Sequence, residues 1–211
     1  MSSKKKVIYY KDELNDDFAE NNIKRKSLSE NFKYVHTNLF WRVFEFVLYY
    51  VVASPLVYLI QKIYTRQKFV NRKAFKKVKK EGYFIYSNHT QYINDAYIGP
   101  LSNWPKKCFI IANPDVTSIK GIREIVQVLG VIPLGTTFKE IKNMLNCIET
   151  RINQKSAIMI YPEAHIWPFY PDVNLDVTSA AKELRDIAYD TMVKRANEYS
   201  NYEYIKYIKS E

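Results

Sequence analysis

Closely spaced pairs of cysteine or histidine are missing from this chain. Its two cysteines, Cys108 and Cys147, are isolated and lack the spacing of a metal site, so we expect free, buried thiols in a reducing compartment. Residues 1–20 are charged and lack the apolar core of a signal peptide, which argues against secretion. The chain has no zinc finger, helix-turn-helix pattern or RNA-binding aromatic pair, so we do not expect nucleic acid as its partner.

Acidic residues are too few to balance the basic ones, and the 211-residue chain carries a formal net charge of +10. Such an excess points to an anionic partner, either nucleic acid or a membrane surface. The length is typical of one domain with a substantial core. Changes of composition divide it into a charged N-terminal arm at residues 1–37, an apolar anchor with a polybasic segment at residues 38–80, and an α/β domain at residues 81–211.

A stretch without charge occupies residues 46–61. It is shorter than the roughly 20 apolar residues that a membrane-spanning helix needs, and Pro55 would kink it or split it into two helices. Its tyrosines and the preceding Trp41 suit a membrane interface. A buried core helix and a true span are alternatives, but we favour a monotopic or re-entrant anchor.

Nine lysine or arginine residues and no acidic residue follow between Lys62 and Lys80. A solvated helix face would usually mix both signs. An unmixed basic block beside an apolar segment favours attraction to anionic membrane lipids, worth about 1 kcal/mol for each residue near the surface. The block also marks its side of the membrane as cytoplasmic. We therefore expect a monotopic or peripheral protein on the cytoplasmic face of the membrane.

Strands and helices alternate after residue 80, which is typical of an α/β fold. Strands are predicted over residues 83–86, 108–112, 131–134 and 157–161, and helices over residues 119–129, 136–153 and 179–199. Thr137 and Glu140 form a capping-box pattern at the start of the second helix. The apolar face predicted for that helix consists of Phe138, Ile141, Leu145, Ile148 and Ile152.

Polar side chains follow two of the predicted strands. His89 and Asp95 come after the strand at residues 83–86, and Glu163 and His165 come after the strand at residues 157–161. Open α/β sheets bind their ligands beyond strand ends. A neutral imidazole held by a carboxylate can take a proton from a hydroxyl near pH 7. Because the chain has only three histidines, the recurrence favours a catalytic site over two unrelated surface loops.

These residues resemble the motifs of the glycerolipid acyltransferase family, which includes the lysophosphatidate acyltransferases. Asn88-His89 followed by Asp95 resembles the first block of the family. Gly130-Val131-Ile132-Pro133-Leu134 lies where the second block belongs, and Tyr161-Pro162-Glu163 resembles the third. The order and distances of the blocks agree, and the resemblance covers residues 40–170.

The resemblance implies a central mixed sheet flanked by helices, preceded by an N-terminal membrane-associating helical segment. It also implies that a fatty acyl group passes from acyl-CoA or acyl carrier protein to a hydroxyl of a lysolipid or glycerol-phosphate acceptor in phospholipid biosynthesis. Acyl-CoA or acyl carrier protein is then a co-substrate, and neither a cofactor nor a metal is needed. By analogy His89 is the general base, Asp95 orients its imidazole, and Asn88 and Glu163 shape the acceptor site.

Departures from the family motifs bear on both the base and the acceptor. Five residues instead of four separate His89 from Asp95, so Asn94 stands at the family spacing and is the alternative partner of the imidazole. The arginines that bind glycerol phosphate in the second and third blocks are missing, and Lys139 and His165 lie near their places. His165 also has a structural interpretation, as a residue that hydrogen-bonds its loop. These departures weaken lysophosphatidate as the acceptor and favour a less anionic lipid or another hydroxyl.

The fourth block of the family, a Val-Pro motif, has no counterpart in residues 166–175, so we expect a shortened member with reduced or absent activity. Two other classes of protein stay open. One is a metal-dependent hydrolase with His89, Asp95, Glu163 and His165 as ligands, although no tight histidine pair supports it. The other is a non-catalytic peripheral module that binds membranes or nucleic acid through its basic block.

Overall fold

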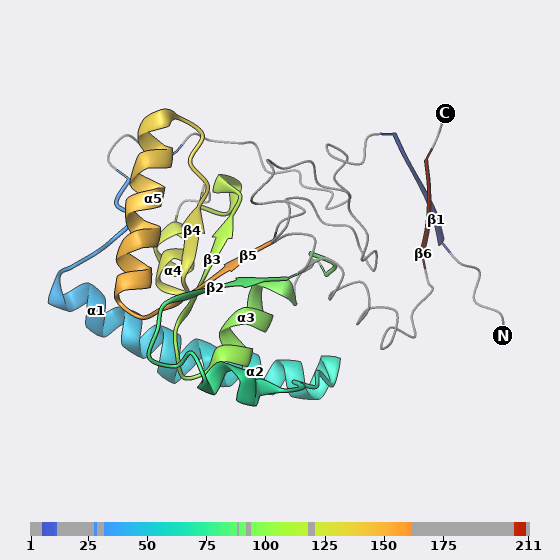
Figure 1. Ribbon diagram of the computed structural model, residues 1–211, viewed down its shortest axis with the longest axis horizontal. Helices are drawn as coiled ribbons and strands as arrows, with labels where there is room; N and C mark the ends of the chain where they lie inside the picture. The colour runs from blue at the N-terminus through green and yellow to red at the C-terminus, as the bar shows by residue number, and fades with distance from the viewer. Residues whose placement is uncertain are drawn as a thin grey trace. The chain divides into compact units, whose positions relative to one another are not determined.

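The computed structural model describes residues 6–11, 28, 32–87, 89–91, 94–117, 121–161 and 205–209 (Figure 1). The chain separates into two compact units. The larger unit comprises residues 22–85 and 96–160, and the smaller unit comprises residues 1–21, 86–95 and 161–211. The helix predicted over residues 179–199 and the place expected for a fourth block lie outside the described residues.

A four-stranded sheet forms the centre of the larger unit. Its strands lie in the order β2–β5–β3–β4, and β3 runs parallel to both of its neighbours. The fold is thus α/β with a parallel sheet flanked by helices, and all four predicted strands are confirmed. The strands are β2 at Tyr83–Tyr86, β3 at Cys108–Ala112, β4 at Val131–Pro133 and β5 at Ala157–Ile160. The helices are α1 at Leu39–Phe46, α2 at Ser54–Ile60, α3 at Asp95–Asn103, α4 at Arg123–Val128 and α5 at Phe138–Asn153.

Helices cover both faces of this sheet. Ile158 on β5 belongs to a buried cluster that includes Met144 of α5. On α3, a β-carbon added to Gly99 would lie 2.3 Å from the sulfur of Met159, so that helix packs closely against the same strand. Because successive residues of a strand point to opposite faces, Ile158 and Met159 mark the two sides, with α5 on one and α3 on the other.

Helix α5 begins as predicted, but only part of its predicted apolar face packs against the core. Thr137 Oγ1 accepts a hydrogen bond from Glu140 N, and Glu140 Oε2 accepts one from Thr137 N, so the capping box is confirmed. Phe138 is 86% exposed and Leu145 is 54% exposed, so this part of the predicted apolar face is wrong. Ile148 and Ile152 of the predicted face do pack against the core, together with Met144 and Cys147, which were not predicted.

Helix α4 is confirmed in a shorter form than predicted. It covers Arg123–Val128 and is followed by Gly130, whose φ of +105° is a left-handed conformation that favours glycine. Cys108 and Cys147 are both free and buried, as expected.

The uncharged stretch lies within one 27-residue helix, Leu39–Thr65. This helix consists of α1, a π-helical segment at Val47–Ala53, α2, and a second π-helical segment at Gln61–Thr65. Pro55 does not split it. The backbone N–H and the hydroxyl of Ser54 both donate to Tyr49 O, five residues earlier, and this wider turn accommodates the proline ring, which would clash in a regular α-helix.

Most of this long helix is uncovered. Its most apolar 18-residue window has a mean hydropathy of 1.9 and is only 11% buried. The exposed side chains include Leu39 at 73%, Phe40 at 82%, Ile63 at 65% and Tyr64 at 81%. By length and composition this is the one helix in the described part of the chain that could cross a membrane. Such exposure does not fit the alternative of a buried core helix.

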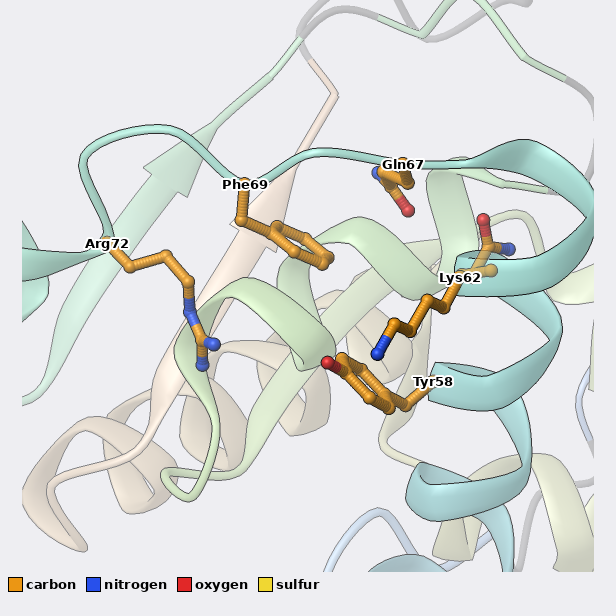
Figure 2. A pocket seen from close by; sticks show the side chains of 6 residues that line it. Tyr58, Lys62, Gln67, Phe69 and Arg72 are labelled. Atoms are coloured by element: carbon orange, nitrogen blue, oxygen red, sulfur yellow. The ribbon is translucent and has the colours of Figure 1, made fainter.

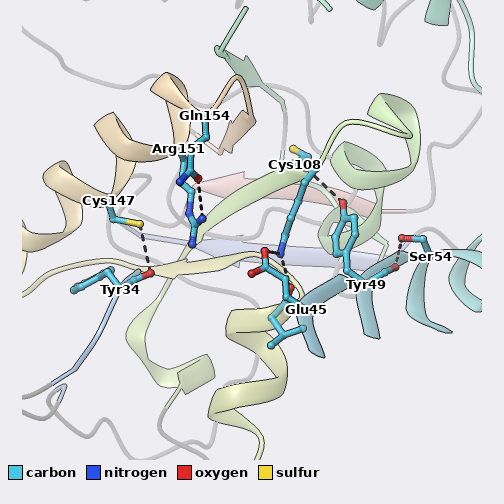
Figure 3. A network of polar contacts seen from close by, with 10 residues as sticks. Tyr34, Glu45, Tyr49, Ser54, Cys108, Cys147, Arg151 and Gln154 are labelled. Atoms are coloured by element: carbon cyan, nitrogen blue, oxygen red, sulfur yellow. Dashed lines mark hydrogen bonds and ion pairs between the residues drawn. The ribbon is translucent and has the colours of Figure 1, made fainter. Parts of the chain in front are cut away.

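One side of the long helix is attached to the sheet. Tyr49 is 2% exposed, and its hydroxyl accepts a hydrogen bond from Cys108 N at 3.4 Å. Glu45 Oε1 lies 2.5 Å from Lys107 Nζ, and both contacts are drawn in Figure 3. The helix therefore lies alongside the amino end of β3, and many of its other apolar side chains are exposed.

Segments that the sequence assigned to the charged arm also have structure. In the larger unit, the hydroxyl of Tyr34 donates to Pro133 O at 3.2 Å, and Cys147 Sγ lies 3.7 Å from Tyr34 O. In the smaller unit, β1 at Lys6–Tyr10 pairs in parallel with β6 at Ile205–Lys209. Neither strand was predicted.

Candidate functional site

The side chains of His89 and Asp95 meet in the smaller unit. His89 Nδ1 lies 2.8 Å from Asp95 Oδ2. The same carboxylate oxygen accepts a hydrogen bond from Gln91 N at 2.9 Å. The side chain of Asp95 is 4% exposed, whereas that of His89 is 23% exposed. The pair is therefore a buried carboxylate that holds a partly accessible imidazole.

The loop between β2 and α3 brings the two residues together. Asp95 is the first residue of α3, where the positive end of the helix dipole favours a carboxylate. The bond from Gln91 N closes the loop on this carboxylate, and the loop accommodates the five intervening residues. The side-chain amide of Asn94 donates to Gln91 Oε1 at 2.6 Å. Asp95, which does not stand at the family spacing, is thus the residue whose carboxylate meets His89 Nδ1.

Tyr161, directly after β5, contacts both members of the His89–Asp95 pair. Its ring stacks on the imidazole of His89, with ring centroids 4.6 Å apart and planes 27° apart. Its hydroxyl donates to the backbone oxygen of Asp95. The sequence placed Tyr161 in the third block without assigning it a role. Its position directly after a strand that leads to Glu163 was the signal that could have identified it.

The arrangement determines which imidazole nitrogen is basic. A carboxylate beside Nδ1 favours the neutral tautomer with its proton on Nδ1, so Nε2 carries the lone pair. The buried carboxylate also stabilises the imidazolium that forms when Nε2 accepts a proton. Chemically, the pair can take a proton from a hydroxyl and later return it to a leaving group.

The structure does not test the roles of the other predicted site residues. Asn88, Glu163 and His165 lie outside the described residues, and Lys139 is exposed in the first turn of α5, in the larger unit. Within the described ranges, no group of three or more His, Cys, Asp or Glu side chains could hold a metal ion. The roles expected for these residues stay predictions.

In a comparison with protein families, a family model described as Acyltransferase matches residues 59–186. The match covers more than half of the 211 residues and includes the His89–Asp95 loop and Tyr161. The chain belongs to the glycerolipid acyltransferase family. Comparisons with curated proteins and with solved structures found no match.

Membership of the glycerolipid acyltransferase family supports a general acyltransferase role. It gives no support to the metal-dependent hydrolase or to the non-catalytic module. The family match continues to residue 186, through a region that lies outside the described residues. The expectation of a shortened, less active member therefore stays a prediction.

A cavity of about 290 Å³ lies at the end of the long helix (Figure 2). Tyr58 and Lys62 reach it from the helix, and Phe69 and Arg72 face them from the segment that follows. The guanidinium of Arg72 donates to Ser102 O at 3.1 Å, so this cation already has a structural partner. All nine basic residues between positions 62 and 80 are exposed, which leaves their charges available to a surface.

Proposed function

We propose that this glycerolipid acyltransferase moves a fatty acyl group from the thioester of acyl-CoA or acyl carrier protein to the hydroxyl of a membrane lipid. The acceptor would be a lysophospholipid or a glycerol-phosphate derivative, and the reaction would belong to phospholipid biosynthesis. The observation that carries the proposal is the 2.8 Å contact between His89 Nδ1 and the buried carboxylate of Asp95.

The reaction follows from this pair. His89 Nε2 takes the proton of the acceptor hydroxyl while the hydroxyl oxygen attacks the thioester carbonyl carbon. The new C–O bond forms, the C–S bond breaks, and the thiolate leaves with the proton that the imidazolium returns. Asp95 holds the imidazole in the required tautomer throughout, and the stack with Tyr161 fixes the plane of the ring.

The acceptor would be bound by residues that supply few positive charges. Asn88, Glu163 and His165 are proposed to shape the acceptor site, with Lys139 as a source of positive charge. Because the two family arginines are missing from the sequence, an acceptor with less negative charge than lysophosphatidate is expected. Comparing Lys139→Gln with Lys142→Gln, an equal loss of charge one turn further along α5, would test the role of Lys139.

The acceptor and the product of the proposed reaction are both membrane lipids. The long helix exposes its apolar side chains, and the nine exposed basic residues follow directly. Its other side is attached to the sheet through Glu45 and Lys107. A helix that spanned the bilayer would carry this ion pair and the end of β3 into hydrocarbon, where charges are costly. We therefore favour a helix that lies in the plane of the cytoplasmic leaflet.

The test is an acyl-transfer assay on the full chain in mixed micelles, with acyl-CoA or acyl carrier protein as donor and a panel of lysolipids as acceptors. His89→Ala should lower turnover by about 10²–10⁴-fold, which is the usual contribution of a general base. Asp95→Asn should cause a comparable loss, because an amide can donate to Nδ1 and place the proton on Nε2. Lys142→Gln, an exposed change on α5, is the control and should retain full activity.

Flotation with anionic vesicles separates the chemistry from membrane binding. His89→Ala should float with the vesicles as the unchanged protein does, whereas Phe40→Ser should float less. If His89→Ala and Asp95→Asn transferred acyl groups at the rate of Lys142→Gln, the assignment of the base would be wrong. If no donor and acceptor in the panel gave product while flotation was normal, a non-catalytic membrane module would be the better description.

A further inference from the structure

A second cavity, of about 570 Å³, lies in the larger unit beside the amino ends of β3 and β5. None of its lining residues belongs to the His89 pair or to the family motifs quoted above. Three basic side chains line it, Arg42 from α1, Lys107 before β3 and Arg151 from α5. Glu45 is its single acidic lining residue. The volume is in the range of small-ligand sites, which run from about 300 to 1,000 Å³.

The one carboxylate that lines this cavity, that of Glu45, already forms an ion pair. Glu45 Oε1 lies 2.5 Å from Lys107 Nζ, which also donates to Val128 O at 2.6 Å. Two guanidinium groups, those of Arg42 and Arg151, are therefore left without a carboxylate from the cavity lining. Like charges gathered around one cavity repel each other, and an anion between them would remove that cost.

Unpartnered nitrogens point to the same conclusion. Arg151 Nη1 donates to Gln154 Oε1 at 2.9 Å, and its guanidinium lies over the ring of Phe109 at 4.5 Å. Its Nε, however, is buried and has no hydrogen-bond partner among the described residues. The same is true of His36 Nε2, on a ring that stacks on Trp41 with centroids 3.8 Å apart. A buried guanidinium N–H is normally satisfied, so Arg151 Nε indicates a missing acceptor, and His36 Nε2 can donate to the same acceptor when it carries the ring proton.

The geometry suits a phosphate group. Figure 3 shows the side chains of Arg151 and Glu45 directed toward the same region from α5 and α1. A guanidinium presents its N–H groups as a planar fork that matches two oxygens of a phosphate. Phe46 also lines the cavity and is 58% exposed on the long helix, so this apolar side chain borders both the cavity and the exposed surface of the helix.

We propose that this cavity is a binding site for an anionic phospholipid, with the phosphate held by Arg42, Arg151 and His36 and the acyl chains passing over Phe46 into the bilayer. The choice of a lipid as the source of the phosphate rests on the membrane association proposed above. The phosphate chemistry itself does not depend on acyl transfer. A lipid bound here would attach α1, β3 and α5 to the membrane at one point, in addition to the diffuse attraction of the basic block.

Calorimetric titration of the full chain tests this proposal, using dihexanoyl phosphatidylglycerol below its critical micelle concentration. Arg151→Gln and Arg42→Gln each remove one positive charge from the cavity. Lys142→Gln removes the same charge from the exposed side of α5 and serves as the control. Because Arg151 packs on Phe109 and its variant could be unstable, the exposed Arg42 provides a second, milder change.

Phosphatidylglycerol should bind the unchanged protein and the control with affinities within twofold, and should bind each cavity variant at least tenfold more weakly. Dihexanoyl phosphatidylcholine should bind more weakly than phosphatidylglycerol, because its choline cation repels the arginines. Competition by inorganic phosphate would support the site with phosphate as its main determinant. Equal affinity in the control and in both cavity variants would overturn the proposal.

His89→Ala should bind phosphatidylglycerol as the unchanged protein does. If the unchanged protein failed to bind phosphatidylglycerol while its acyl transfer was normal, the result would count against this site alone. Failure of acyl transfer with normal lipid binding would count against the proposed function alone.

Discussion

Because Lys107 is buried, the free energy of unfolding of the protein should rise with pH. The Lys107 side chain is 8% exposed and lies between the rings of Tyr49 and Phe109, each 4.8 Å from Nζ. Burial lowers the pKa of Lys107 from 10.5 to about 8, and the opposing effect of Glu45 is smaller. Above the folded pKa the unfolded chain binds more protons than the folded one, so stability increases as the pH rises from 8 toward 10.5. The cost of the buried charge is present in full below the folded pKa.

The size of this effect follows from the two pKa values. Since one pKa unit corresponds to about 1.4 kcal/mol, Lys107 should raise the free energy of unfolding by about 2 kcal/mol between about pH 7 and pH 9.5. Lys107→Met retains the length of the side chain and removes the charge. Its free energy of unfolding should therefore gain about 2 kcal/mol less over the same pH range, because other titrating groups contribute equally to both proteins.

Urea unfolding in a non-ionic detergent, followed by circular dichroism, measures this difference. Lys142→Met is the control, since Lys142 is exposed on α5, and its pH dependence should match that of the unchanged protein. Parallel curves of unfolding free energy against pH for Lys107→Met and the unchanged protein would refute the reasoning. Such a result would mean that Lys107 remains charged throughout and that the Glu45 contact outweighs burial.

Two further predictions concern the turn into α5. Thr137→Ala removes the hydrogen bond to Glu140 N and should lower the free energy of unfolding by about 1 kcal/mol, measured by urea titration; an unchanged midpoint would show that water replaces the cap. Gly135→Ala would place a β-carbon 2.4 Å from Ile141 N, a backbone atom that cannot rotate away, and should cost about 1–3 kcal/mol in the same assay. Asn146→Ala on the exposed side of α5 is the control for both, and equal stability of Gly135→Ala and this control would contradict the close approach.

The elements of the sheet could be predicted because their signals are local. Each strand is a short apolar run, and the capping box at Thr137 marks a helix start within four residues. Helix α3 was missed because Gly99 and Pro100 both disfavour a helix interior. The glycine at position 99 is explained by a tertiary contact, because a β-carbon there would collide with the side chain of Met159. The face of α5 was predicted only in part because two apolar stripes overlap on it, and the choice between them depends on the sheet.

The candidate site was predictable in its residues but not in its contacts. The strand-end positions of His89 and Asp95 made both visible in the sequence, and spacing alone left Asn94 as a rival. The fold favours Asp95 because it begins α3 and receives the Gln91 N–H. The stack of Tyr161 on His89 joins residues 72 positions apart, and such long-range contacts have no signature in a local pattern.

The contacts between the long helix and the sheet also set an order of events during synthesis. Tyr49 and Glu45 bind partners that lie 59 and 62 positions later in the chain. At about 5–20 residues per second, the ribosome needs on the order of 3–12 s to add these partners. During that interval the nascent helix has no sheet to pack against, and its apolar side can settle on a membrane first. If the proposed membrane association holds, the sheet would then fold onto a helix that is already in place, and membrane delivery and folding of the enzyme would become one process.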